Sequence, residues 1–415
     1  MCSSDLALSV LMAYLPVTFE GLSYKAENGE RVQLSGLAAI HYAKDAGASL
    51  SGAVTAKKIQ TAVGEYQEAL REYGVEDSFE LPEDVYYDRL MIYQPFIHGV
   101  KEVFSDEKTG MAPGLLDIDP EEVGTFYERA PIRLENLMRM EGSRQSDIDK
   151  AEEMYREIET PFQYYEGVSG NSMDYQVLTI FLLTIICAVI VSPVFSMDYQ
   201  TGADDILRCT KHGRLHLAVF KILAALVITG VTFLLCGVLW ILTTNTLFGW
   251  ESTKTSMQML FSVSSLPALT IGELEWTNLL GSFLLFFSLM SLILFLSARI
   301  RNAAVALAAA MFFCILPIIT YIGAPETLAN WLQCLLPGGA LGLNNSLLYA
   351  MTELDFLHPG GLSVWNVHLM FVIVARQVVI SKNAANRESL LQTLFVFVIT
   401  LIAVLFIFKK KVPEL

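Results

Sequence analysis

Five long stretches without a charged residue dominate the second half of this chain of 415 residues. Each stretch holds between 20 and 29 residues and is rich in leucine, isoleucine, phenylalanine, valine and alanine. A helix that crosses a bilayer needs roughly 20 mostly apolar residues, and a buried helix of a soluble protein rarely reaches this length without a charge. The sequence therefore predicts an α-helical polytopic membrane protein. Its predicted spans are 175–197, 222–248, 276–298, 302–323 and 389–408.

Charge divides the chain into two unlike parts. Residues 1–174 contain 32 Asp and Glu against 15 Lys and Arg, a balance of −17. Residues 175–415 contain 11 against 13, a balance of +2. This contrast excludes a uniform soluble globule. Since neither part is strongly basic, it also argues against a nucleic-acid-binding protein.

Basic residues indicate the orientation, because Lys and Arg gather in cytoplasmic loops. The loop 198–221, the connection 299–301 and the C-terminus after 408 each carry at least two of them. With five spans these segments fall on one side, which we take as the cytoplasm. Residues 20–172 then form an extracytoplasmic domain and 173–415 the transmembrane domain. Three bases lie on the outer side against this rule: Arg376, Lys382 and Arg387.

Residues 327–387 form a long connection before the last span. Prolines and glycines, such as Pro337 and Pro359, interrupt its apolar stretches. Broken backbone is tolerated at membrane depth only where protein or water covers it. We expect a re-entrant or interfacial connection, and a partly apolar extracytoplasmic loop fits the pattern about as well.

The beginning of the chain holds an apolar stretch that is too short to span. Leu6–Phe19 has 14 uncharged residues and no basic residues before it, so it is a poor signal peptide. Because residues 20–172 must be exported, we expect residues 1–19 to be a truncated first span, of which Leu6–Leu15 is the last part. Met1–Leu6 match the translation of a common short-read sequencing adapter, and we expect them to be artefactual.

Residues 20–172 have the size of one domain. Thr55 precedes a helical pattern of apolar residues that Gly74 can end. Ser146 and Asp149 resemble a capping box at the start of a second helix, and Asn28-Gly29 marks a turn between two short strands. We expect a mainly helical (α+β) domain with little strand. Its acidity most simply keeps it soluble, although it could attract a cationic peptide.

Motifs of catalysis or nucleotide binding are absent from the sequence, which has no P-loop, no H-E-x-x-H and no G-x-S-x-G. His212 and His216 have the spacing of metal ligands, but no acidic third ligand is near, so a surface loop is favoured over a zinc site. The five charge-free stretches also lack His, which disfavours a proton-driven carrier. We therefore expect no enzyme activity and no cofactor in this chain, with energy supplied by another subunit.

The loop 198–221 has the pattern of a short amphipathic helix over 201–212. Thr201 and Asp204 have the spacing of a capping box. Acidic residues near the start and basic residues near the end suit the helix dipole, and Gly213 can end the helix. Such a helix would be a rigid lever, or an ordinary helix on the membrane surface.

This loop resembles the coupling segment of permease subunits in type-2 ABC exporters. In that pattern F-x-x-E-x-x-x-G is followed by L-x-x-T, by G-R and by K. The matching residues are Phe195, Gly202, Leu207, Thr210, Gly213, Arg214 and Lys221. Asp198 replaces the Glu of the pattern, which keeps the charge but shortens its reach by one methylene. The order of a first span, a large outer domain and five further spans is similar as well.

The resemblance implies a bacterial plasma-membrane permease that exports an amphipathic substrate such as a peptide, an antibiotic or a lipid-like molecule. Two permease chains, as a homodimer or a heterodimer, would form the path through the lipid bilayer. Separate ABC ATPase subunits, which hold ATP and Mg²⁺, would dock on the coupling helix. The resemblance assigns Asp198, Gly202, Arg208, Thr210 and Arg214 to this interface, without a catalytic role.

Two alternatives remain. A membrane-anchored peptide sensor or immunity protein would act through the acidic outer domain without transport. An intramembrane enzyme is disfavoured, because no span carries a nucleophile next to a base.

Overall fold

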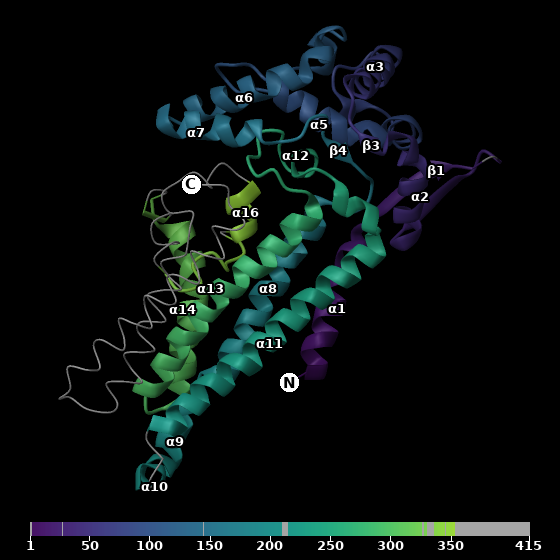
Figure 1. Ribbon diagram of the computed structural model, residues 1–415. Helices are drawn as coiled ribbons and strands as arrows, with labels where there is room; N and C mark the ends of the chain where they lie inside the picture. The colour runs from purple at the N-terminus through teal and green to yellow at the C-terminus, as the bar shows by residue number, and fades with distance from the viewer. Residues whose placement is uncertain are drawn as a thin grey trace.

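The computed structural model describes residues 2–26, 28–143, 145–209, 215–325, 328–329, 336–344 and 346–352. The predicted span 389–408 and most of the predicted connection 327–387 lie outside these residues. In the described part, a bundle of long helices carries a second domain at one end (Figure 1). We call this second domain the head domain.

Four helical stretches are long and apolar enough to cross a membrane: 170–201, 217–248, 271–299 and 303–323. The first of them combines α8 (Gly170–Val191) with α9 (Pro193–Thr201), and the others belong to α11 (Leu215–Phe248), α13 (Ile271–Arg299) and α14 (Ala303–Gly323). They coincide with the first four predicted spans. The chain is therefore a helical, multi-pass membrane protein.

A further apolar helix, α1 (Cys2–Phe19), lies alongside α8 and α11 (Figure 1). Its apolar stretch, Ser4–Phe19, is shorter than the four spanning stretches. The assignment of this stretch to a first span stays a prediction.

Helix α13 packs closely against its neighbours in the bundle. A Cβ atom on Gly237 of α11 would lie 2.2 Å from Cδ1 of Leu279, so a larger residue at 237 would force the Leu279 side chain to move. Thr270 and Glu273 form a capping box at its start. At the next helix start, Asn302 accepts from the backbone N–H groups of Ala304 and Val305 at 2.9 and 3.2 Å. Local capping thus sets where α13 and α14 begin.

The head domain is mostly helical and contains two small antiparallel pairs of strands. β1 pairs with β2, and β3 pairs with β4. Its longer elements are β1 (Gly21–Lys25), β2 (Arg31–Ser35), α2 (Leu37–Gly47), β3 (Gly52–Ala53), α3 (Ala56–Tyr73), α5 (Gln94–Val103), α6 (Phe126–Met140), α7 (Gln145–Arg156) and β4 (Gln163–Tyr164). Short helical turns join them: η1 (Ala48–Leu50), η2 (Ser78–Glu80), α4 (Glu83–Val85), η3 (Tyr86–Leu90), η4 (Met91–Tyr93), η5 (Leu115–Asp117) and η6 (Glu122–Thr125).

The predicted hairpin and the predicted first helix are confirmed. Leu22 pairs with Leu34 across the turn at Asn28-Gly29. Thr55 accepts from the N–H of Lys58 at 3.4 Å at the start of α3, and Gly74, with φ of 66°, ends it. The predicted capping box at Ser146 is wrong, because α7 begins at Gln145 and encloses Ser146 in its first turn.

The connection between α11 and α13 belongs to the head domain. It contains η7 (Trp250–Lys254) and α12 (Met257–Leu260), and Val263 and Leu266 lie in the same apolar core as α3, α5 and α6. The N–H of Ser256 donates to the carbonyl of Gln163 at 2.9 Å, which attaches the connection beside β4. The head domain is thus built from two segments of the chain, 20–168 and 249–270.

Glu102 on α5 holds this connection in place. Its Oε1 accepts from Oγ of Ser262 at 2.6 Å and from Oγ and N of Ser264 at 2.7 and 3.1 Å. Its Oε2 accepts from N of Val263 at 2.9 Å. One carboxylate therefore satisfies a whole turn of the connection.

Two acidic side chains lie where the head domain joins α8. Burial raises the pKa of Glu166, although a hydrogen bond from the Tyr164 hydroxyl opposes this effect. Burial also raises the pKa of Glu20, and the nearby charge of Glu166 adds to it. Both carboxyl groups thus hold a proton more tightly than exposed ones.

We predict that Glu102→Gln destabilises the head domain by about 2 kcal/mol, since a neutral amide accepts more weakly and turns an N–H₂ group toward donors. Thermal unfolding of the full chain in detergent, followed by near-UV circular dichroism, measures this loss. Glu107→Gln, at an exposed acid on the same segment, is the matched control and should leave the transition unchanged. Equal stability of the two variants would contradict the role given to Glu102.

Candidate functional site

Three of the nine sequence-predicted site residues come together at the end of the bundle away from the head domain. Phe195 and Asp198 lie on α9, and Lys221 lies on α11. Gly202 follows α9, and Leu207 and Arg208 lie on α10 (Ala203–Cys209). The remaining three lie outside the described residues: Thr210, Gly213 and Arg214.

Lys221 joins α11 to α9 through three contacts. Its ammonium group forms an ion pair with the Asp198 carboxylate and donates to the carbonyl of Val194 at 3.2 Å. It also lies 5.8 Å from the ring centroid of Phe195, within the range of a cation–π interaction. The side chains of Lys221 and Asp198 are only 25% and 23% exposed. The pair is therefore partly shielded from water, which strengthens it relative to a surface ion pair.

α9 is a separate helix because Pro193 follows Ser192 at its first position, where a proline needs no N–H partner. The free N–H groups of its first turn find a partner on another helix. Oγ of Ser297, near the end of α13, accepts from N of Phe195 at 2.9 Å and from N of Ser196 at 3.2 Å. A side chain of α13 therefore caps α9 from outside.

Two further contacts attach the end of α9 to neighbouring helices. The Tyr199 hydroxyl donates to the carbonyl of Ala298 on α13 at 3.2 Å. Oε1 of Gln200 accepts from N of Ala303, at the start of α14, at 3.3 Å. Together with Lys221, these bonds connect α9 to the ends of three spanning helices.

Gly202 makes the turn between α9 and α10. Its φ of 72° lies in the left-handed region, which glycine adopts without strain. Thr201 is the last residue of α9, and its hydroxyl donates to the carbonyl of Met197 at 2.9 Å. The predicted capping box of Thr201 and Asp204 is therefore wrong, since a helix C-terminus occupies the place of the expected N-cap.

The coupling helix predicted over 201–212 corresponds to α10, which begins two residues later, at Ala203. Residues 210–212 of that prediction lie outside the described part. Ile206 is 72% exposed on α10, so the short helix presents an apolar side chain away from the bundle. In Figure 1, α10 lies at the extreme end of the molecule, opposite the head domain.

Ser297, Tyr199 and Gln200 take part in this site but escaped the sequence analysis. A serine within an apolar stretch commonly bonds the backbone of its own helix, so Ser297 carried no signal of its own. Gln200 and Tyr199 stand between residues of the matched pattern, and only their contacts with α13 and α14 reveal them.

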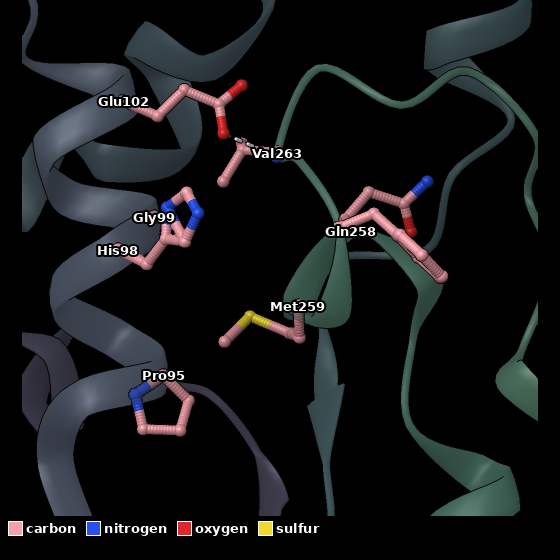
Figure 2. A pocket seen from close by; sticks show the side chains of 8 residues that line it. Pro95, His98, Gly99, Glu102, Gln258, Met259 and Val263 are labelled. Carbon is pink, nitrogen blue, oxygen red and sulfur yellow. Dashed lines mark hydrogen bonds between the residues drawn. The ribbon is translucent and has the colours of Figure 1, made fainter. Parts of the chain in front are cut away.

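A small hollow lies between α5 and α12 in the head domain (Figure 2). Its lining consists of Pro95, His98, Gly99, Glu102, Gln258, Met259, Phe261 and Val263. The Glu102 carboxylate is already bonded to the connection that forms the opposite wall. We therefore interpret this place as the contact between two segments of the head domain. Among the described residues, no group of three or more His, Cys, Asp or Glu is arranged to hold a metal.

We predict that Lys221→Met and Asp198→Asn each lower the stability of the full chain by about 1–2 kcal/mol, since each leaves a partly buried charge unpaired. The double variant should lose less than the sum of the single losses, with a coupling of about 1 kcal/mol. Thermal unfolding of the four proteins in detergent measures the cycle. Strict additivity would contradict a direct interaction between the two side chains.

Comparison with known proteins does not identify this site. No protein-family model, curated protein or solved structure matches this chain. What the site does is therefore inferred from the residues that it brings together and from the helices that they connect.

Proposed function

We propose that this protein is the permease subunit of an ATP-driven ABC exporter in a bacterial plasma membrane. The observation that carries the proposal is the contact of Lys221 with both Phe195 and Asp198. These residues belong to the matched pattern and lie up to 26 positions apart in the sequence. Separate ATPase subunits, holding ATP and Mg²⁺, dock on α10 and on the loop that follows it. This chain contributes no catalytic residue.

The proposed mechanism uses α9 and α10 as a lever. A force on α10 passes through the turn at Gly202 into α9. Because α9 is bonded to Lys221, Ser297 and Ala303 on three different helices, it transmits the force to α11, α13 and α14 together. Closure of the ATPases would thus tilt these helices and open a path on the other side.

Asp198 in place of glutamate is compatible with this lever. The shorter carboxylate still forms an ion pair with Lys221, whose long side chain extends from α11 to α9. An aspartate therefore suffices for the contact with Lys221 in this chain.

The head domain is placed to move with the same helices. The connection 249–270 joins α11 to α13, and Glu102 bonds it to α5. Tilting of α11 or α13 would therefore be passed to the head domain. This link is the reason that we assign the domain to the transport cycle.

The surface of the bundle supports the proposed partners. Large apolar side chains are exposed along α11 and α14, among them Leu223, Val227, Ile315 and Ile319. Such faces suit lipid and a second permease chain, with which this chain would form a path for an amphipathic substrate.

The proposal predicts that the chain co-purifies with its cognate ATPase and stimulates ATP hydrolysis in membranes. Arg208→Glu on α10 should reduce this stimulation about tenfold, because it reverses a charge at the interface. Arg156→Glu, at an exposed arginine of the head domain, is the control and should have no effect. Normal association and transport in Arg208→Glu would count against the lever.

The proposed topology has its own test in intact cells. A membrane-impermeant maleimide should modify Lys150→Cys on the exposed surface of the head domain. The exposed native Cys209 on α10 should react only after the membrane is opened. Peptide mass spectrometry distinguishes the two sites in one sample. Modification of Cys209 and protection of position 150 in intact cells would reverse the orientation.

A further inference from the structure

A buried network of polar side chains joins three spanning helices near the head domain. Asn245 of α11 donates from Nδ2 to Oε2 of Glu275 on α13 at 2.7 Å. Gln176 of α8 donates to the backbone carbonyl of Glu275 at 3.0 Å and accepts from Asn278 at 2.9 Å. None of these four side chains is more than 2% exposed, and Glu275 is fully enclosed.

In the sequence, Glu275 immediately precedes the predicted span 276–298. In the structure α13 begins at Ile271, so the carboxyl group lies inside the bundle. The spanning helix α13 therefore does contain a buried ionisable group, contrary to expectation. Ionisable groups enclosed in a membrane domain are rare and commonly functional.

The hydrogen bonding of this network is incomplete at one place. Oε1 of Glu275 and Oδ1 of Asn245 are both buried without a hydrogen-bond partner in the described part of the chain. Both oxygens accept hydrogen bonds when the carboxyl group is ionised, so neither can satisfy the other. An ionised carboxylate that receives one donor in such surroundings is strongly disfavoured.

Charged groups on the neighbouring elements are engaged elsewhere. Asp174 on α8 accepts from the Tyr349 hydroxyl of α16 (Leu347–Thr352) at 2.6 Å. Glu273 caps its own helix, and Lys254 lies 3.9 Å from Glu251 in η7. α1 carries only an acid, Asp5, in its first turn and no base in its last.

Two other buried hydrogen-bond donors lie on α11, the helix that carries Asn245. Nε1 of Trp240 and Oγ1 of Thr244 are buried, yet neither bonds the carboxyl group or the amide. Within the described residues, the side chains around Glu275 thus supply neither a cation nor a second donor.

We propose that Glu275 and Asn245 form a proton-binding site in the membrane domain. A proton on Oε1 removes the charge and turns this oxygen into a donor. Asn245 already donates to the same carboxyl group through Nδ2. Its Oδ1 is an acceptor without a donor, so it can accept the new hydrogen bond from Oε1. The pair is then a carboxylic acid and a carboxamide, which each donate to the other.

The site connects proton occupancy to the packing of α11 against α13. Loss of the proton to water leaves a negative charge beside an unpartnered acceptor. This state favours separation of the two helices and entry of water, which solvates both oxygens. This proton site does not depend on the proposed exporter function, because it is formed by residues of α11 and α13 alone.

Infrared spectroscopy of the full chain in nanodiscs tests the proposal, because carboxylic acid and carboxylate absorb at different frequencies. The difference spectrum between the native chain and Glu275→Gln at neutral pH should show loss of a carboxylic acid band that shifts in D₂O. Glu275→Gln keeps the shape and neutrality of the protonated side chain. Glu20, Glu166 and Asp5 are common to both proteins and cancel.

Two controls make the result decisive. Glu273→Gln, at an exposed acid two residues earlier, should show loss of carboxylate bands only. Asn245→Ala should shift the carboxylic acid band, and this variant serves if Glu275→Gln does not fold. Loss of carboxylate bands alone in Glu275→Gln would overturn the proposal. So would a carboxylate band in the native chain that shifts when sodium is replaced by choline, since it would assign a metal ion.

Discussion

Polar groups inside a membrane-spanning bundle have no water to bond, and this constraint accounts for the contacts on which the structure depends. Ser297 satisfies two N–H groups at the start of α9, and Lys221 satisfies a carbonyl and a carboxylate. Partial burial limits the competition of water for these bonds between helices. The break between α8 and α9 is tolerated because Ser297 of α13 supplies a partner for N–H groups in the first turn of α9.

α13 brings these contacts together. At one end Ser297 and Ala298 hold α9, and at the other end Thr270 lies beside Ser256 at the edge of the head domain. Between them, Gly237 of α11 closely approaches Leu279 of α13. A rigid helix with attachments at both ends can pass a displacement from one side of the bundle to the other. The proposed coupling of α10 to the head domain depends on this property.

The buried network at Glu275 lies on the same helix pair. A carboxyl group in this position makes the packing of α11 and α13 sensitive to a single charge. A bundle that must open and close gains from such sensitivity, because a small chemical change then alters the balance between two packed states. In contrast, the Asp198–Lys221 pair carries its own counter-ion and keeps its attachment in place.

Sequence patterns predicted the local features of this fold well. The lengths of the charge-free stretches indicated the first four spans, and the apolar spacing after Thr55 indicated α3. The predictions at Thr201 and Ser146 were wrong because both residues lie inside helices. Thr201 is the last residue of α9, and Ser146 is in the first turn of α7.

The sequence by itself determined that this is a helical membrane protein with an acidic, mainly helical domain, since these properties follow from composition and periodicity along a single segment. Only the tertiary structure decided that residues 249–270 complete the head domain and that Glu102 holds them there. It alone enclosed Glu275 beside Asn245 and brought Lys221 to Asp198. These contacts join residues from 23 to 162 positions apart. Their partners are chosen by how whole helices pack, which no local pattern records.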